Sequence, residues 1–274
     1  MRLDARQQAD APIGILDSGL GGLTIWREIR DQLPDESTIY IGDHAYQPYG
    51  GRSVGVIRRR VTHLITFLLR QRAKIIVVAC NTATVAGIDV YRRWFPGTPI
   101  IGVVPVVKTA VSLTKTKHVA MLSTPFTAAS SYQKRLIKTF AHGCTVENIG
   151  IPDLASLIEE GALVGRMERL LRQFLNPKKM NRVDVIALGC THYPFIRDKI
   201  GEIIGKGVSI IDSGGAVARH TARILDANTL RVNGKKRYTI FYTTGDAVKV
   251  SRIARRLMGE NIQFVHEHER NARV

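Results

Sequence analysis

Two short apolar runs in this chain end at a cysteine. Residues 74–80 read KIIVVAC, and residues 183–190 read VDVIALGC. Each run is about as long as a buried strand and far too short to cross a bilayer. A strand that is apolar throughout is typical of a parallel sheet covered by helices on both faces. The chain is therefore predicted to be an α/β protein in which each cysteine ends a buried parallel strand.

Strand patterns alternate with helical patterns in the first hundred residues. PIGILDS (12–18) and STIYIGD (37–43) are predicted strands that precede the run ending at Cys80. Apolar residues recur at helical spacing between these strands, namely Leu23, Trp26, Ile29 and Leu33, and then Ile57, Val61, Leu64, Ile65 and Leu68. This order predicts an open parallel sheet with helices on both faces.

The strand pattern recurs in the second part of the chain. Asp17 aligns with Thr124 and Asp43 with Gly150, both at a separation of 107 residues, and Cys80 aligns with Cys190 at 110. Ligands bind at the carboxyl ends of strands in open α/β sheets. We therefore predict two pseudo-symmetric open parallel-sheet domains that face each other across an active-site cleft, with one cysteine on each wall.

The last part of the chain is expected to return to the first domain. The strand YTIFYTT and the helix VKVSRIARRLM follow the predicted domain that carries Cys190. The first α/β domain is thus predicted to be discontinuous, with residues 1–103 plus 216–274 and Cys80. The second is predicted to comprise residues 104–215 and to carry Cys190.

Polar residues follow both cysteines at predicted helix starts. Asn81 and Thr82 are predicted to cap one helix, and Pro194 suits the first turn of the other. A helix amino terminus stabilises a thiolate and offers free N–H groups to a carboxylate. Inverting a stereocentre that bears a hydrogen needs a base on one face and an acid on the other. Two equivalent thiols suit that reaction. The alternative is that both are structural cysteines buried in the core, and Cys144 is interpreted in that way.

Four motifs occur in order along the chain: DSGLGG (17–22), PYG (48–50), CNTAT (80–84) and GCTHYP (189–194). Together they resemble glutamate racemase, of the aspartate/glutamate racemase superfamily, over nearly the whole chain. The histidine after the second cysteine, His192, points to the glutamate branch. The resemblance implies an isomerase that converts L-glutamate to D-glutamate for peptidoglycan without pyridoxal phosphate, another cofactor or a metal.

The resemblance also implies roles for individual residues. Cys80 and Cys190 are the two acid/base groups, Asp17 assists Cys80, and His192 assists Cys190. Glu159 resembles the glutamate that contacts this histidine, but its neighbour Glu160 leaves that assignment open. The residues implied to hold the substrate are Asp17, Ser18, Tyr49, Gly50, Asn81, Thr82, Thr124, Thr127, Thr191 and His192.

Purely structural roles are the alternative for several of these residues. Asp17 could simply cap the helix that follows the glycines, and His192 could be a structural histidine. DSGLGG is a weak match to a dinucleotide loop, because Thr24 stands where the third glycine belongs. His266 and His268 resemble a metal pair only in composition, and a solvated tail is the better interpretation.

Other functions remain open at this stage. Aspartate racemisation is the nearest alternative, and hydrolysis by Cys190 with His192 would leave Cys80 without a role. The formal net charge of +17 could attract nucleic acid or a nucleic-acid enzyme such as gyrase. The basic residues are spread out, however, and no nucleic-acid motif accompanies them.

The start of the chain contains no apolar stretch of signal-peptide length. We expect a cytoplasmic protein with glutamate as its small-molecule partner, no membrane contact, and a homodimeric state. The first dozen residues and the polar tail HEHERNARV (266–274) are expected to be disordered.

Overall fold

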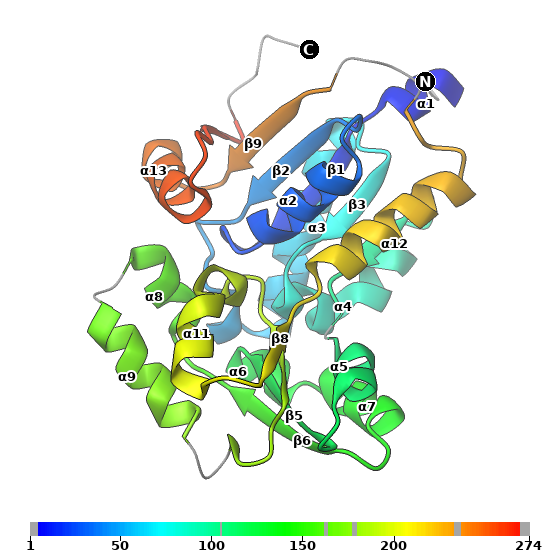
Figure 1. Cartoon of the computed structure of the whole chain (residues 1–274). Coiled ribbons are helices and arrows are strands. Elements are labelled where there is room, and N and C mark those ends of the chain that lie inside the picture. Colours follow the sequence, from blue (N-terminus) through cyan, green and yellow to red (C-terminus); the bar gives the residue numbers. More distant parts are fainter. Residues whose placement is uncertain (1–4, 105, 162–163, 177–179, 233–236, 269–274) are drawn as a thin grey trace. The chain divides into compact units, whose positions relative to one another are not determined.

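The computed structural model describes residues 5–104, 106–161, 164–176, 180–232 and 237–268. The chain divides into two compact units, one made of Met1–Val103 and Gly214–Val274 and the other of Val104–Ser213. Each unit is built on its own parallel sheet with flanking helices, which confirms the predicted α/β class (Figure 1). The two units are described separately below.

The first unit contains a six-stranded sheet. Its strands are β1 (Ile13–Asp17), β2 (Thr38–Gly42), β3 (Ile75–Val78), β4 (Ile100–Gly102), β9 (Thr239–Thr243) and β10 (Phe264–His266). They are ordered β10-β9-β2-β1-β3-β4, and every pair is parallel. All residues of β1, β2 and β3 are buried, as expected for strands covered on both faces.

Helices lie on both faces of this sheet. They are α2 (Leu23–Gln32), α3 (Val54–Arg70), α4 (Asn81–Trp94), α12 (Gly214–Ala227) and α13 (Ala247–Met258), with a short 3-10 turn η1 (Tyr49–Gly51). Helix α12 packs on α2, and α3 packs on α4 (Figure 1). The apolar residues that predict α2 and α3 form their buried faces.

The amino-terminal segment departs from the expected disorder. Residues 5–10 form helix α1 (Ala5–Asp10), and Ala9 and Ala11 are buried. The ammonium group of Lys74 donates a 2.5 Å hydrogen bond to the Ala9 carbonyl. The polar tail is likewise ordered at its start, where His266 ends β10 and Glu267 donates its N–H to the Thr243 carbonyl. Residues 269–274 lie outside the described part of the chain.

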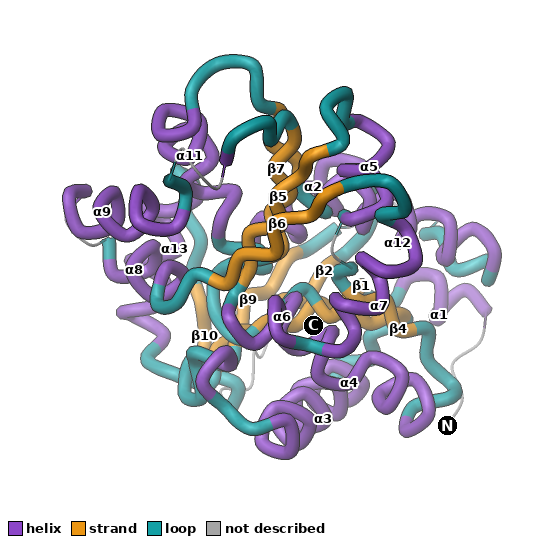
Figure 2. Tube along the Cα trace, turned by 90° about the horizontal axis from the view of Figure 1, so that it is seen from below, coloured by secondary structure: helices purple, strands orange, loops and turns teal. Residues whose placement is uncertain are grey.

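The second unit contains a four-stranded parallel sheet. Its strands are β5 (His118–Ser123), β6 (Thr145–Gly150), β7 (Val185–Gly189) and β8 (Ser209–Ile211), ordered β6-β5-β7-β8. Its helices are α5 (Val107–Leu113), α6 (Pro125–Ala129), α7 (Ser131–Phe140), α8 (Leu154–Glu160), α9 (Val164–Phe174) and α11 (Arg197–Ile204), with a 3-10 turn η2 (Tyr193–Ile196). Figure 2 shows β6, β5 and β7 side by side.

The two sheets share one topology. The order β2-β1-β3-β4 in the first unit matches β6-β5-β7-β8 in the second. Cys80 follows β3 and Cys190 follows β7, so each cysteine lies at the carboxyl end of the equivalent strand. The predicted internal repeat is therefore a repeat of strand order. No helix among the described residues is long and apolar enough to span a membrane.

Candidate active site

Cys80 lies at the junction of β3 and α4 and is 5% exposed. It is itself the N-cap of α4, and its Sγ accepts a hydrogen bond from the Ala83 N–H at 3.4 Å. The Ser18 hydroxyl lies 3.6 Å from the same sulfur. The prediction that Asn81 and Thr82 cap this helix is wrong, because both lie inside its first turn. Peptide N–H groups at a helix amino terminus stabilise negative charge on the sulfur directly.

Asp17 ends β1 and is fully buried. Its Oδ2 accepts hydrogen bonds from the N–H groups of Gly19 and Gly22, at 3.2 and 2.9 Å. Gly22 is the N-cap of α2, so Asp17 does support that helix. Its Oδ1 is buried and has no hydrogen-bond partner among the described residues. A buried oxygen of this kind is costly unless a ligand or another group supplies a donor.

Asn81 and Tyr49 lie in the same unit. Asn81 is 3% exposed, and its Oδ1 is a second buried oxygen without a hydrogen-bond partner among the described residues. Tyr49 is buried, and its hydroxyl donates a 2.6 Å hydrogen bond to Asp43. Burial, with Asp43 next, raises the pKa of the Tyr49 hydroxyl well above its ordinary value. The phenol is therefore a poor proton source.

Cys190 occupies a different local structure. The chain after it forms the 3-10 turn η2, whose N-cap is His192 and whose first turn contains Pro194. A regular helix amino terminus at Cys190 was the expectation, and this part of it is wrong. The Cys190 sulfur lies 3.9 Å from Nδ1 of His192 instead. The His192 imidazole is therefore placed to interact with this sulfur.

His192 is held from its far side by Glu159. The distance from His192 Nε2 to Glu159 Oε1 is 2.6 Å, and both side chains are buried. Burial alone would lower the pKa of His192, but the hydrogen bonds and charges of Cys190 and Glu159 outweigh it and raise the pKa well above its ordinary value. Glu159 rather than the exposed Glu160 makes this contact. A protonated imidazole can stabilise the thiolate or deliver a proton.

The second unit also places three threonines shortly after the carboxyl ends of β5 and β7. Thr124 caps α6, where its hydroxyl accepts from the Thr127 N–H at 3.3 Å. Thr127 and Thr191 are buried. Every predicted site residue thus ends a strand or lies in the segment that follows one. The first unit holds Asp17, Ser18, Tyr49, Gly50, Cys80, Asn81 and Thr82, and the second holds Thr124, Thr127, Glu159, Cys190, Thr191 and His192.

Comparison with known proteins gives the family. The family model described as Asp/Glu/Hydantoin racemase matches residues 22–221. This chain belongs to that racemase family. The predicted resemblance to the aspartate/glutamate racemase superfamily is thereby confirmed.

Relatives of this racemase-family chain match it over nearly its full length. It is 38% identical to the glutamate racemase of Ectopseudomonas mendocina, over 93% of this chain and 98% of that one. It is 40% identical to the glutamate racemase of Pseudomonas syringae pv. tomato, over 86% of each chain.

Solved glutamate racemases share the fold. The isoform RacE1 of Bacillus anthracis has a TM-score of 0.84 and 34% identity, covering 93% of this chain and 97% of that one. The Escherichia coli enzyme, solved in complex with L-glutamate and the activator UDP-MurNAc-ala, has a TM-score of 0.81 and 31% identity, with the same coverage.

The third cysteine of this racemase-family chain packs as a small core hydrophobe, as predicted. Cys144 is half-buried against the apolar core of the second unit. The rings of His266 and His268 lie 5.1 Å apart, and His268 is largely exposed. Among the described residues, no group of three or more His, Cys, Asp or Glu side chains is arranged to hold a metal ion.

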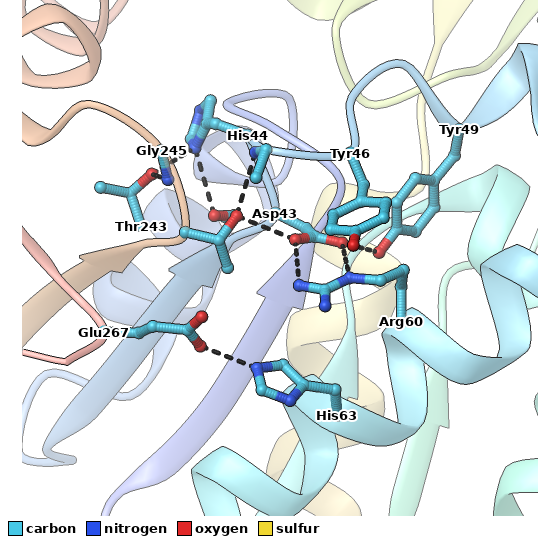
Figure 3. Close-up of polar contacts among 12 residues, drawn as sticks. Asp43, His44, Tyr46, Tyr49, Arg60, His63, Thr243, Gly245 and Glu267 are labelled. Carbon is cyan, nitrogen blue, oxygen red and sulfur yellow. Dashed lines mark hydrogen bonds and ion pairs between the residues drawn. The ribbon is translucent and has the colours of Figure 1, made fainter.

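Sequence reasoning overlooks a buried group beside the predicted site. Asp43 ends STIYIGD and is fully buried. It lies beside Tyr49 and Arg60 (Figure 3), and Thr244 also donates to it. Its position after a strand is the same signal that identifies Asp17. Asp43 is not part of a recognised motif, whereas Asp17 begins DSGLGG.

Proposed function

We propose that this chain racemises glutamate, with Cys80 and Cys190 exchanging protons at opposite faces of the α-carbon and without a cofactor. The observation that carries the proposal is the pair of buried thiols at equivalent strand ends. Cys80 accepts a hydrogen bond from the Ala83 N–H, and Cys190 lies beside the imidazole of His192. The glutamate racemases at 38% and 40% identity support the choice of substrate. The proposal requires both thiols to act on one substrate molecule.

Each direction of the reaction begins with one thiolate and one thiol. The thiolate takes the α-proton, and the opposite thiol donates its own proton to the other face. Peptide N–H groups of α4 stabilise the charge on Cys80, and the His192–Glu159 pair serves Cys190. Asp17, with its unpartnered buried Oδ1, is proposed to assist proton movement at Cys80.

Neutral donors are proposed to bind the substrate. Negative charge develops on the α-carboxylate as the α-proton leaves, and fixed hydrogen-bond donors stabilise that charge. The hydroxyls and amides in the two units supply such donors without adding a competing base. They belong to Ser18, Asn81, Thr82, Thr124, Thr127 and Thr191, and Tyr49 and Gly50 complete the proposed contacts.

The proposed biological role follows from the product. D-glutamate made by this reaction supplies peptidoglycan synthesis, and the enzyme is proposed to work in the cytoplasm as a homodimer. These assignments rest on the resemblance to the glutamate racemases.

A direct assay tests the activity and the two-thiol mechanism together. Incubation of the protein with L-glutamate, without added cofactor, should give a racemic product. The reaction is followed by circular dichroism as the signal of L-glutamate is lost. Cys80→Ala and Cys190→Ala should each lose at least about 10²-fold in rate, because general acid–base groups contribute roughly that much or more. Cys144→Ala is the matched control and should retain full activity.

The same assay separates the alternatives. L-Aspartate turned over faster than L-glutamate would replace the proposed substrate. Normal turnover by either Cys80→Ala or Cys190→Ala would overturn the two-thiol mechanism even if the chain is a racemase.

A further inference from the structure

Asp43 is a buried carboxylate to which the proposed reaction gives no task. It follows β2 directly and has no exposed surface. Its Oδ2 accepts hydrogen bonds from the Tyr49 hydroxyl at 2.6 Å and from Nε of Arg60 at 2.9 Å. Its Oδ1 accepts from Nη2 of Arg60 at 2.7 Å and from the Thr244 hydroxyl at 2.9 Å. Figure 3 shows Tyr49 and Arg60 directed at the Asp43 side chain.

The donors come from segments far apart in the sequence. Tyr49 belongs to η1, Arg60 to α3, and Thr244 follows β9. The backbone of Asp43 adds further ties, because its N–H donates to the Asp17 carbonyl at 3.0 Å. Its carbonyl accepts from the N–H groups of Tyr46 and Gln47. Asp43 therefore joins the start of the 43–52 loop to three other parts of the first unit.

Arg60 holds the same loop from a second direction. Its guanidinium makes a bidentate contact with Asp43, a geometry that only arginine can provide. The guanidinium also stacks over the ring of Tyr46, 3.9 Å from the ring centroid (Figure 3). Tyr46 and Tyr49 both lie in the 43–52 loop, so Arg60 and Asp43 fix it at two points.

The pairing has an electrostatic reason. A single buried carboxylate beside a site for glutamate, whose two carboxylates and one ammonium leave a net negative charge, would repel the substrate and would cost several kcal/mol to bury. Arg60 cancels that charge, so the pair gains geometric specificity without adding net charge. The pair is thus suited to holding a loop and not to moving a proton.

We propose that Asp43 and Arg60 are positioning residues that hold the 43–52 loop so that Tyr49 and Gly50 meet the substrate. This inference rests on the proposed function and adds two residues that act through Tyr49 rather than on the reacting atoms. Because the loop is proposed to bind substrate, loosening it weakens substrate binding more than it slows proton transfer.

Two conservative variants test the inference. Tyr49→Phe removes only the hydroxyl that donates to Asp43, and Arg60→Lys keeps the charge but loses the bidentate contact. Each should raise KM for glutamate about 5- to 30-fold, as losing a charge-assisted hydrogen bond would. The kcat of each should stay within about twofold of wild type. Asp43→Asn should have a larger effect in the same direction.

The chain offers a matched control for simple destabilisation. Glu36 and Lys74 form another buried ion pair in the first unit, with Nζ 2.5 Å from Oε2, at the amino ends of β2 and β3. Glu36→Gln should lower the melting temperature and leave KM unchanged.

The outcomes are separable. If Tyr49→Phe and Arg60→Lys lose melting temperature as Glu36→Gln does but keep the wild-type KM, the pair is merely structural and the inference is wrong. A fall in kcat at unchanged KM would also overturn it. Failure of the wild type to racemise glutamate in the same assay would overturn the proposed function instead.

Discussion

His192 lies between a sulfur and a carboxylate, and this placement decides its chemistry. Its Nδ1 is 3.9 Å from the Cys190 sulfur, and its Nε2 is 2.6 Å from Glu159. Burial opposes a positive charge on the imidazole, but the two partners outweigh burial and raise its pKa. The protonated form therefore persists to a higher pH than in a free histidine, whose pKa is about 6.5.

Glu159→Gln should remove part of that support. The pKa of His192 should fall, so that the alkaline limb of the kcat/KM profile moves to lower pH. The charged pair stabilises the fold fully below the unfolded pKa of histidine, and this contribution is lost as pH rises through the raised folded pKa. The stability difference from wild type should therefore be largest near pH 6 and shrink at alkaline pH, as thermal melts across pH would show.

Glu160→Gln is the control for this prediction. It changes the neighbouring exposed glutamate and should leave both the pH profile and the melting temperature at wild-type values. Equal effects of the two variants would show that Glu159 has no special relation to His192.

Helix α6 depends on a close approach to β6. A methyl group added at Gly150, the last residue of β6, would lie 2.8 Å from the Cα of Pro125. Pro125 begins α6, which Thr124 caps. The amide of Asn148 also donates to the Ala128 carbonyl at 2.9 Å. The strand end and the helix thus fix the position of Thr124 and Thr127, two proposed substrate contacts.

Gly150→Ala should force α6 away from β6. We expect a loss of about 1 to 3 kcal/mol in the free energy of unfolding, as for other overpacked sites. KM for glutamate should rise severalfold, because both threonines move with α6. Denaturant unfolding and steady-state kinetics measure the two effects.

Gly165→Ala makes the same substitution in α9, where a methyl group would meet no atom within 4 Å. It should leave kinetics unchanged and stabilise the fold by up to about 1 kcal/mol, because alanine loses less backbone freedom on folding than glycine does. An unchanged KM in Gly150→Ala would show that α6 does not position the substrate.

Charge is a property of the whole molecule. The residues assigned to the first unit include 25 Lys and Arg against 14 Asp and Glu, and those of the second include 15 against 9. Both units therefore carry a net positive charge. A field of this sign raises the local concentration of anions such as glutamate, and salt screens it.

Salt should therefore lower kcat/KM for glutamate and leave kcat nearly unchanged. Raising NaCl from about 0.02 to 0.3 M shortens the screening length severalfold, and we expect kcat/KM to fall severalfold with it. Initial rates over this range provide the measurement. If kcat/KM is independent of salt, the charge does not serve the substrate. Salt-sensitive DNA binding that persists in Cys80→Ala and Cys190→Ala would then assign it to nucleic acid.

Local patterns were enough to predict much of this protein. Strand and helix periodicity predicted strands β1, β2, β3 and β7 and helices α2 and α3, because a buried parallel strand is apolar throughout and a helix buries one stripe. The apolar strands pointed to Cys80 and Cys190 at their ends, and the motif DSGLGG pointed to Asp17. All three residues lie at carboxyl ends of parallel strands, which share one edge of a sheet.

Only the tertiary structure decided which side chains meet. It selected Glu159 over Glu160, made Cys80 the cap of α4 while giving Cys190 an imidazole, and gathered Arg60 and Thr244 around Asp43. Periodicity describes neighbours within a few residues, whereas Asp43 and Thr244 are about two hundred residues apart. Contacts of that separation depend on how strands are ordered in a sheet, and no local pattern encodes that order.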